Sequence, residues 1–312
     1  MSLHRESPLR AAATQPPVEV SGPARDVTEE EFRVLAAKIA RETSFSCESY
    51  KPQVLRRRIA VRMRACNVGS YPEYAGVLDT DRREYACLLD ALTVNVTRFF
   101  RDPATYEVLA SGIVPALWDA SDDAISVWSA GTASGEEAYS LAALFHDEAL
   151  RRRELPRLGR VRIIGTDIDR ASLLTAARAE YAPSAFHETP RDVLDRLFPR
   201  ADGTGVGDTR VVASLLRGLV SFQRRDLLRE PAPSGRFDLV VCRNVIIYLD
   251  RAAQEALLAT LHGALRPGGY LVLGRAEMLL GSARARFAPV VPRERIFQRV
   301  ESVVGHAGAR RG

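Results

Sequence analysis

The sequence predicts an α/β protein in which a doubly wound, mostly parallel sheet follows a separate all-helical domain. After residue 101, short apolar segments alternate with helical segments, which is typical of parallel strands with helices on both faces of the sheet. Between about residues 27 and 100, the apolar residues show helical spacing alone. The chain has 312 residues, 46% hydrophobic and 27% charged, which is enough for roughly two globular domains.

The N-terminal part is expected to contain a tail and a helical domain. Residues 1–26 are rich in Pro, Ala and polar residues without periodicity, so we expect a disordered tail there. The helical domain should span residues 27–100 and begin near Thr28, which forms a capping box with Glu31. A second tail is expected at 301–312.

One helix of this domain, at residues 51–66, contains six Lys or Arg residues and no acidic residue. Arg57 and Arg64 point away from the apolar face, which is formed by Leu55, Ile59, Met63 and Cys66. The basic side of this helix is either solvated surface or a docking surface for an acidic partner.

The second domain, at residues 101–300, should contain the sheet. Strands are expected at 125–129, 161–166, 219–222, 237–242 and 270–273, and helices at 136–150, 170–179 and 251–264. A tight turn, R-P-G-G at 266–269, precedes the last of these strands. Two further segments, 287–291 and 296–300, could close the sheet as a hairpin. The alternation lapses between 190 and 217, so we expect a small insertion with a short strand at 210–213.

The turn after the first strand is the most informative feature of this domain. Its sequence is V-W-S-A-G-T-A-S-G-E-E, and Gly131 and Gly135 allow the backbone to bend sharply and to lie close against a ligand. Glu136 and Glu137 open the next helix, where acidic side chains would repel a phosphate. The turn therefore favours a ligand that is cationic or rich in hydroxyls and amines. S-adenosylmethionine fits, because it carries a sulfonium, an ammonium and a ribose but no phosphate.

Polar residues follow the next three strands, where an open α/β sheet binds its ligand. Asp167 is placed to accept both ribose hydroxyls, Asp226 to bind the adenine amino group, and Asn244 to meet the methionine moiety. Each has an alternative interpretation. A strand-end Asp such as Asp167 or Asp169 often caps the following helix, and Arg243-Asn244 fits an ordinary turn.

Other functional classes find less support. G-T-A-S-G is not the G-x-G-x-x-G of nicotinamide enzymes, and no Walker-type phosphate loop is present. Four scattered cysteines without a C-x-x-C pair favour neither a disulfide framework nor a zinc site, and they make the cytoplasm the default compartment. No apolar run approaches the roughly 18 residues of a membrane span. The formal net charge of +5 permits an acidic partner without demanding nucleic acid.

Five segments together resemble the CheR-type chemotaxis receptor methyltransferases over about residues 30 to 300. They are L-T-V-N-V-T-R-F-F-R-D at 92–102, W-S-A-G-T-A-S-G-E-E-A-Y-S at 128–140, G-T-D-I-D at 165–169, F-D-L-V-V-C-R-N-V-I-I-Y-L-D at 237–250 and L-R-P-G-G-Y-L-V-L-G-R-A-E at 265–277. The resemblance implies a class I S-adenosylmethionine-dependent methyltransferase (Rossmann-like) domain behind an all-helical domain, with a small antiparallel β-subdomain inserted at about 190–220. The implied reaction is methyl transfer to glutamate side chains of membrane chemoreceptors, leaving S-adenosylhomocysteine.

The resemblance also implies roles for individual residues. The residues implied to bind the cofactor are Asn95, Thr97, Arg101, Glu136, Asp167, Asp226, Leu227, Arg243 and Asn244, in addition to Gly131 of the turn. Arg98 and Tyr248 would face the incoming glutamate, Arg98 to orient its carboxylate and Tyr248 to give one hydrogen bond. The basic helix at 51–66 would dock the acidic methylation region of a receptor. The inserted subdomain resembles the part that some relatives use to bind a receptor's C-terminal peptide.

Three departures from the family pattern bear on activity. The turn T-A-S-G at 132–135 has Ala133 where a hydroxyl is usual, and Ala138 replaces a proline. G-R-A-E at 274–277 replaces G-H-S-E and puts Arg275 near the mouth of the expected active site. A non-catalytic protein that binds S-adenosylmethionine or S-adenosylhomocysteine is therefore an alternative. An RNA methyltransferase is a third hypothesis, which would predict strongly salt-dependent RNA binding.

Overall fold

The computed structural model describes residues 29–43, 45–93, 97–121, 123–201 and 208–300. The expected N-cap Thr28, both expected tails and the cofactor residue Asn95 lie outside this part of the chain. Within it, no helix combines the length and apolarity that crossing a membrane requires.

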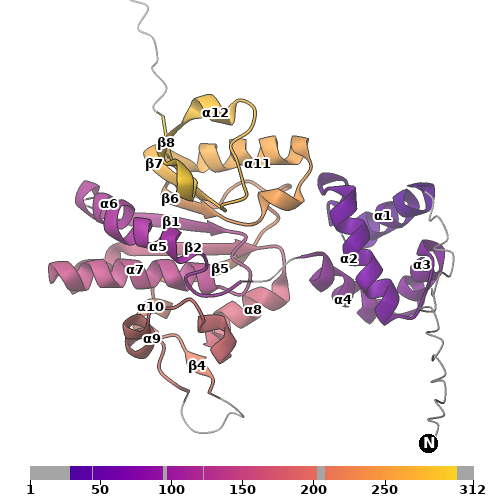
Figure 1. Cartoon of the computed structure of the whole chain (residues 1–312), viewed down its shortest axis with the longest axis horizontal. Coiled ribbons are helices and arrows are strands. Elements are labelled where there is room, and N and C mark those ends of the chain that lie inside the picture. The colour runs from indigo at the N-terminus through magenta and orange to yellow at the C-terminus, as the bar shows by residue number, and fades with distance from the viewer. Residues whose placement is uncertain (1–28, 44, 94–96, 122, 202–207, 301–312) are drawn as a thin grey trace, which may run out of the picture.

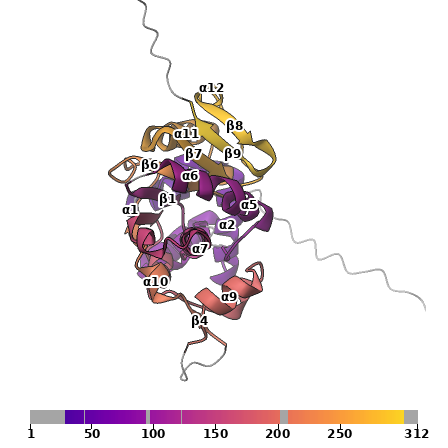
Figure 2. The same ribbon diagram turned by 90° about the vertical axis from the view of Figure 1, so that its left-hand side faces the viewer.

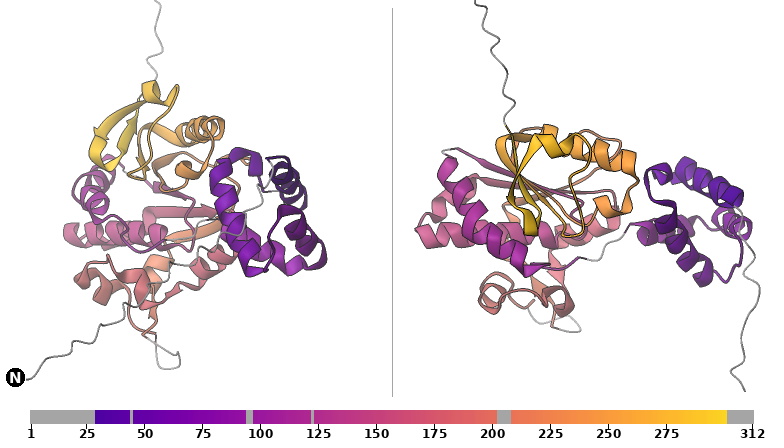
Figure 3. Two further views of the ribbon diagram at one scale, coloured as in Figure 1. Left: turned by 45° about the vertical axis from the view of Figure 1, so that its right-hand side comes forward. Right: turned by 45° about the horizontal axis from the view of Figure 1, so that its top comes forward.

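The first domain is a bundle of four helices that lies beside the sheet (Figures 1 and 3). Its helices are α1 (Glu29–Thr43), α2 (Pro52–Ala65), α3 (Tyr71–Thr80) and α4 (Arg82–Leu92), with a short turn η1 (Cys47–Ser49) between α1 and α2. Leu55, Ile59 and Met63 of α2 are buried in the bundle core, as their spacing predicts. Cys66 follows the helix as its C-terminal cap and is partly exposed.

The second domain is built on a seven-stranded sheet, and the predicted doubly wound fold is confirmed. The strand order is β5-β2-β1-β6-β7-β9-β8. The first five are parallel neighbours: β5 (Val220–Arg224), β2 (Val161–Asp167), β1 (Ile125–Ala130), β6 (Phe237–Cys242) and β7 (Leu265–Leu273). The expected hairpin, β8 (Phe287–Val291) and β9 (Ile296–Arg299), completes the sheet through antiparallel pairing of β9 with β7.

Helices cover both faces of this sheet. Side chains alternate along β6, so that Leu239 and Val241 join the core beneath α7 (Glu136–Arg152), whereas Val240 and Cys242 join the core beneath α11 (Arg251–Ala264). Figures 1 and 2 show α7 and α11 on opposite sides of the strands. Further helical elements of this domain are α8 (Arg170–Arg178), α12 (Ala283–Arg286), η3 (Leu155–Arg160), η5 (Ile246–Tyr248) and η6 (Pro292–Glu294).

Three features differ from the sequence prediction. A helical stretch that the prediction lacks precedes β1: α5 (Pro103–Val108), a π turn η2 (Leu109–Ile113) and α6 (Val114–Ala120). The expected turn at 266–269 lies inside β7, because Leu265 pairs with Phe237 and Tyr270 with Leu239, and the four residues between them bulge out.

The third difference concerns the insertion, which begins about ten residues earlier than expected. The strand that pairs with β4 (Arg210–Val211) is β3 (Glu180–Tyr181), in antiparallel register. Between and after them lie η4 (Pro183–Phe186), α9 (Arg191–Leu197) and α10 (Ser214–Arg217). This inserted segment, residues 180–217, is thus more helical than the prediction, and α9 and α10 lie on the α7 side of the sheet (Figure 2).

Candidate active site

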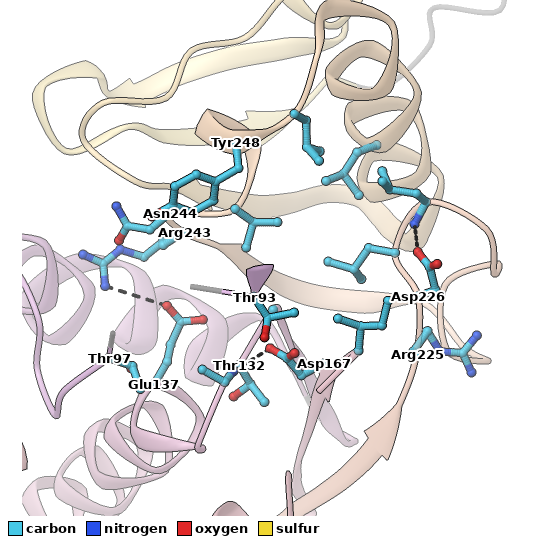
Figure 4. A pocket seen from close by; sticks show the side chains of 18 of the residues that line it. Thr93, Thr97, Thr132, Glu137, Asp167, Arg225, Asp226, Arg243, Asn244 and Tyr248 are labelled. Atoms are coloured by element: carbon cyan, nitrogen blue, oxygen red, sulfur yellow. Dashed lines mark hydrogen bonds and ion pairs between the residues drawn. The ribbon is translucent and has the colours of Figure 1, made fainter. Parts of the chain in front are cut away.

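A cavity of about 990 Å³, open mouth included, lies at the carboxyl ends of β1, β2, β5 and β6. Parallel strands end at one edge of a sheet, so the polar residues that follow them are brought together there. Figure 4 shows these side chains converging on the cavity. Of the residues predicted for the site, those that line it are Thr97, Arg98, Arg101, Gly131, Asp167, Asp226, Leu227, Arg243, Asn244 and Tyr248.

The turn after β1 is bent as its glycines predict. Gly131 has φ +79°, and a Cβ there would lie 2.4 Å from Val245 Cγ2. Gly135 has φ +93°, and a Cβ there would lie 2.7 Å from the Cβ of Ala176. Ala133 also adopts a left-handed conformation, with φ +48°. The backbone therefore passes closely over its neighbours, where a side chain at either glycine would clash.

Asp167 and Asp169 have different surroundings at the end of β2. Asp169 caps α8 by accepting hydrogen bonds from Ala171 N and Ser172 N, at 2.9 and 3.2 Å. Asp167 lines the cavity at the end of β2 and accepts from Ala133 N at 2.8 Å and Asp169 N at 2.9 Å. Burial raises the pKa of Asp167, and these backbone donors oppose that shift.

The two acidic residues at the start of α7 lie differently with respect to the cavity. Glu137 lines the cavity, accepts a hydrogen bond from Ser129 Oγ at 2.8 Å and lies 3.8 Å from Arg243 Nη1. Glu136 is buried, but its carboxylate accepts from Ser134 Oγ and is not part of the cavity lining. Adjacent helical residues point about 100° apart, so only one of the two acids faces the cavity. Sequence spacing alone does not determine how α7 is rotated about its axis relative to the cavity.

Arg243 connects the end of β6 to the segment at 97–102. Its Nη2 donates to the Arg101 carbonyl oxygen at 2.8 Å and to Asp102 Oδ2 at 2.6 Å. Its guanidinium also lies over the Tyr106 ring, 5.5 Å from the ring centroid. The Arg243 guanidinium is therefore already bound by groups of the protein. The amide of the neighbouring Asn244 lies at the cavity wall (Figure 4).

Glu277 fixes the loop that carries Asn244, a role that sequence reasoning missed. This carboxylate is buried and accepts from the backbone N–H groups of Gly274, Asn244 and Ile247, at 2.6, 3.1 and 3.3 Å. Asn244 is held at φ +61° by this arrangement. A Cβ on Gly274 would lie 2.8 Å from the Glu277 carboxylate, so the G-x-x-E spacing reflects close packing.

The two residues predicted to face a substrate both line the cavity and are partly exposed. Arg98 Nη1 lies 3.2 Å from Glu188 Oε1 of the inserted segment, and the Arg98 side chain is 41% exposed. Tyr248 lies in η5, and its carbonyl oxygen accepts from Lys51 N at 2.9 Å. Arg275 of the G-R-A-E departure is not part of the cavity lining, and its Nη2 lies 3.5 Å from Glu294 Oε1.

The helical domain forms part of the cavity wall, which no local sequence signal indicates. Tyr50, Leu92 and Thr93 all line it. Burial, followed by the charges of Asp226 and Asp167, raises the pKa of Tyr50 well above its usual value. Backbone pairing between Tyr50 and Leu249 joins the two domains directly beside the mouth.

The residues of the cavity fit S-adenosylmethionine. Thr132 Oγ1 is buried at the cavity wall and has no hydrogen-bond partner within the described residues. Asp167 and Glu137 add carboxylate acceptors suited to ribose hydroxyls and to an ammonium group. Leu227 and Leu257 add apolar side chains to the lining, which suits an adenine ring.

This fold, with acceptors at successive strand ends, is that of a class I S-adenosylmethionine-dependent methyltransferase. Residues 95–294 match the family model described as CheR methyltransferase, SAM binding domain, and residues 30–93 match the CheR methyltransferase, all-alpha domain. The chain belongs to the CheR methyltransferase family, and S-adenosylmethionine is its cofactor.

Curated relatives agree with this assignment. Chemotaxis protein methyltransferase 2 of Pseudomonas aeruginosa is 34% identical over 80% of this chain and 87% of its own length. Chemotaxis protein methyltransferase 1 of the same organism is 38% identical over 62% of this chain and 69% of its own. An uncharacterized 104.1 kDa protein of Rhodobacter capsulatus is 38% identical over 80% of this chain, which spans 25% of that protein's length.

Proposed function

We propose that the protein transfers a methyl group from S-adenosylmethionine to glutamate side chains of chemoreceptors and so tunes chemosensory adaptation. The observation that carries the proposal is the lining of the cavity, which combines the buried carboxylates of Glu137, Asp167 and Asp226 with the more exposed side chains of Arg98 and Tyr248. The names of the Pseudomonas aeruginosa relatives support a chemotactic role. Four free cysteines support a cytoplasmic location, where the methylation regions of receptors would be accessible.

The residues would divide the work of holding the cofactor. Asp167 accepts the ribose hydroxyls, and the loop at Asp226 and Leu227 contacts the adenine. Glu137, in place of Glu136, receives the ammonium group, and Arg101 is suited to the carboxylate. When bound, the cofactor supplies a methyl group made electrophilic by the neighbouring sulfonium.

A glutamate substrate needs no general base, because its carboxylate is already ionised near neutral pH. The protein must therefore align one carboxylate oxygen and keep water from the reacting atoms. Arg98 orients that carboxylate without fully neutralising it, because Arg98 is already paired with Glu188. Tyr248 gives one hydrogen bond that fixes the approach.

Two surfaces would bind the receptor. On α2, Arg56 pairs with Glu29 and Arg62 with Glu84, so docking of an acidic helix depends chiefly on the exposed Arg57 and Arg64. A receptor's C-terminal peptide would add to the short β3–β4 sheet of the inserted segment.

The test is transfer of radiolabelled methyl to receptor-enriched membranes, with Asp167→Ala as the control. Base-labile label on a receptor band that is lost with Asp167→Ala supports glutamyl ester formation. Calorimetric binding of the cofactor without label on any of several receptors would instead support the non-catalytic alternative. Label on RNA would support the third hypothesis.

A further inference from the structure

The segment that carries Arg98 is attached to the inserted segment at several points. Phe99 N donates to the Ala185 carbonyl oxygen at 2.9 Å. The Phe99 side chain is fully buried and stacks on Phe186 with ring centroids 4.5 Å apart. Asp102 N donates to Glu188 Oε2 at 2.8 Å. The conformation of residues 98–102 therefore depends on the inserted segment.

These contacts hold a backbone that would not adopt its conformation unaided. Phe100 has φ +54° and Asp102 has φ +62°, and neither is glycine. Left-handed residues of this kind persist when surrounding contacts determine them, and they are frequent at functional sites. The Glu188 carboxylate contributes to this by accepting from Asp102 N, and the same carboxylate pairs with the Arg98 guanidinium.

We propose that Glu188 is a positioning residue that sets how Arg98 receives the substrate carboxylate. This inference rests on the proposed function. Glu188 presents to Arg98 the same group, a carboxylate, that a substrate glutamate would present. It thus competes with the substrate for the guanidinium, and it keeps Arg98 from holding the attacking oxygen too tightly.

The proposal predicts opposite effects on substrate capture and on chemistry. Without the negative charge of Glu188, Arg98 is free to bind the incoming carboxylate, so the KM for the receptor should fall. A carboxylate held more firmly by a cation is a weaker nucleophile, so kcat should fall as well. A residue that merely supported the fold would lower kcat and raise KM, and it would weaken cofactor binding too.

Glu188→Gln is the informative variant, because the glutamine amide oxygen can still accept from Asp102 N while the charge is lost. Asp192→Asn makes the same charge change at an exposed position of α9 and serves as the matched control. We would measure KM and kcat with a receptor cytoplasmic fragment, and the Kd of S-adenosylhomocysteine by calorimetry. The expected result for Glu188→Gln is a fall of roughly threefold in both KM and kcat, with the Kd unchanged. Asp192→Asn should change none of the three.

The Arg98→Ala background shows whether the effect passes through Arg98. There, Glu188→Gln should no longer lower KM. A KM that does not fall in the single variant, or one that still falls without Arg98, would overturn the inference. If the wild-type protein itself transfers no label to receptors, the proposed function fails and takes the inference with it. Wild-type activity with an unchanged variant rejects the inference alone.

Discussion

Gly131 stands where the close approach of two loops leaves no room for a side chain. Its φ of +79° and the 2.4 Å distance from a built Cβ to Val245 Cγ2 both oppose substitution. Gly131→Ala should lower the free energy of unfolding by about 1–3 kcal/mol and weaken S-adenosylhomocysteine binding at least about tenfold, because Val245 lines the cavity. Urea denaturation and calorimetry measure the two effects.

Gly76→Ala is the control for this substitution. Gly76 is an exposed position of α3 with nothing within 4 Å of a built Cβ. Alanine there should raise stability by about 0.5–1 kcal/mol, because glycine is the poorer helix former. Equal effects at both positions would contradict the steric argument for Gly131.

Glu277 is a second residue whose chemistry is set by its surroundings. Each of its oxygens accepts from the backbone, and an amide has only one acceptor oxygen. Glu277→Gln should therefore place an NH₂ group against a backbone N–H and cost about 1–3 kcal/mol of unfolding free energy. Since Asn244 is held by the same carboxylate, the affinity for S-adenosylhomocysteine should fall too. Wild-type stability and affinity in this variant would show that the three backbone bonds are dispensable.

At the residue scale, most of the residues predicted for the site line the cavity, but the sequence did not predict the direction of each side chain. Asp167, Asp226 and Asn244 were predicted from their positions after strands, because the carboxyl ends of parallel strands lie at one edge of the sheet. The choice between Glu136 and Glu137 depended on the rotation of α7, which is set by packing against the sheet. Glu188 and Glu277 accept hydrogen bonds from backbone N–H groups. Such contacts cannot be predicted from the spacing of residue types, because every residue except proline has a backbone N–H.

At the element scale, the uninterrupted strands and long helices of the second domain were predicted to within two residues at each end, whereas interrupted elements were not. The strand at 237–242 and the helix at 251–264 have the predicted bounds, because uninterrupted apolar periodicity marks them. The stretch from α5 to α6 contains Gly112 and Pro115, which argue locally against a helix. A π turn at Leu109–Ile113 contains Gly112, and Pro115 lies in the first turn of α6, where proline is tolerated.

Glu84 connects three helices of the first domain and should dominate its stability. Its carboxylate accepts from Arg62 of α2 at 2.9 and 2.6 Å and from Tyr74 of α3 at 2.6 Å. Glu84→Gln should lower the free energy of unfolding by about 1–3 kcal/mol at pH 7. Urea denaturation followed by circular dichroism measures this change. Glu30→Gln, at an exposed position of α1, should change it by less than about 0.5 kcal/mol.

The effect of Glu84 should depend on pH with a defined sign. Hydrogen bonding to Arg62 holds the pKa of Glu84 below its usual value of 4.5. A carboxylate with a lowered pKa in the folded state adds stability above its unfolded pKa, and that stability is lost as the pH falls through the folded pKa. The difference in the free energy of unfolding between wild type and Glu84→Gln should thus be largest at neutral pH and become smaller below about pH 4. A difference that grew on acidification would contradict the assignment.

At the scale of the whole molecule, the helical domain forms part of the cavity wall. Lys51 donates to the carbonyl oxygens of Tyr248 and Ile247, at 2.9 and 2.8 Å, and Asp250 N donates to the Ser49 carbonyl oxygen at 2.9 Å. The loop that carries Tyr248 is therefore held from the other domain. The sequence predicted both domains but not this contact, because contacts between domains depend on surface complementarity that no local periodicity encodes.

A ligand bound between the two domains should protect both from opening. Each domain forms one wall of the cavity, and neither wall can open before the ligand is released. The rate of amide hydrogen exchange should therefore fall in proportion to the ratio of ligand concentration to Kd, about 100-fold at a ligand concentration of 100 Kd. With S-adenosylhomocysteine, we expect slower hydrogen exchange in the turn at 131–135 and also at 47–51, where Tyr50 lines the cavity. Asp167→Ala should abolish both effects, and α3, which contributes no residue to the cavity lining, serves as the internal reference. Protection confined to the turn would mean that the cofactor is held by the second domain alone.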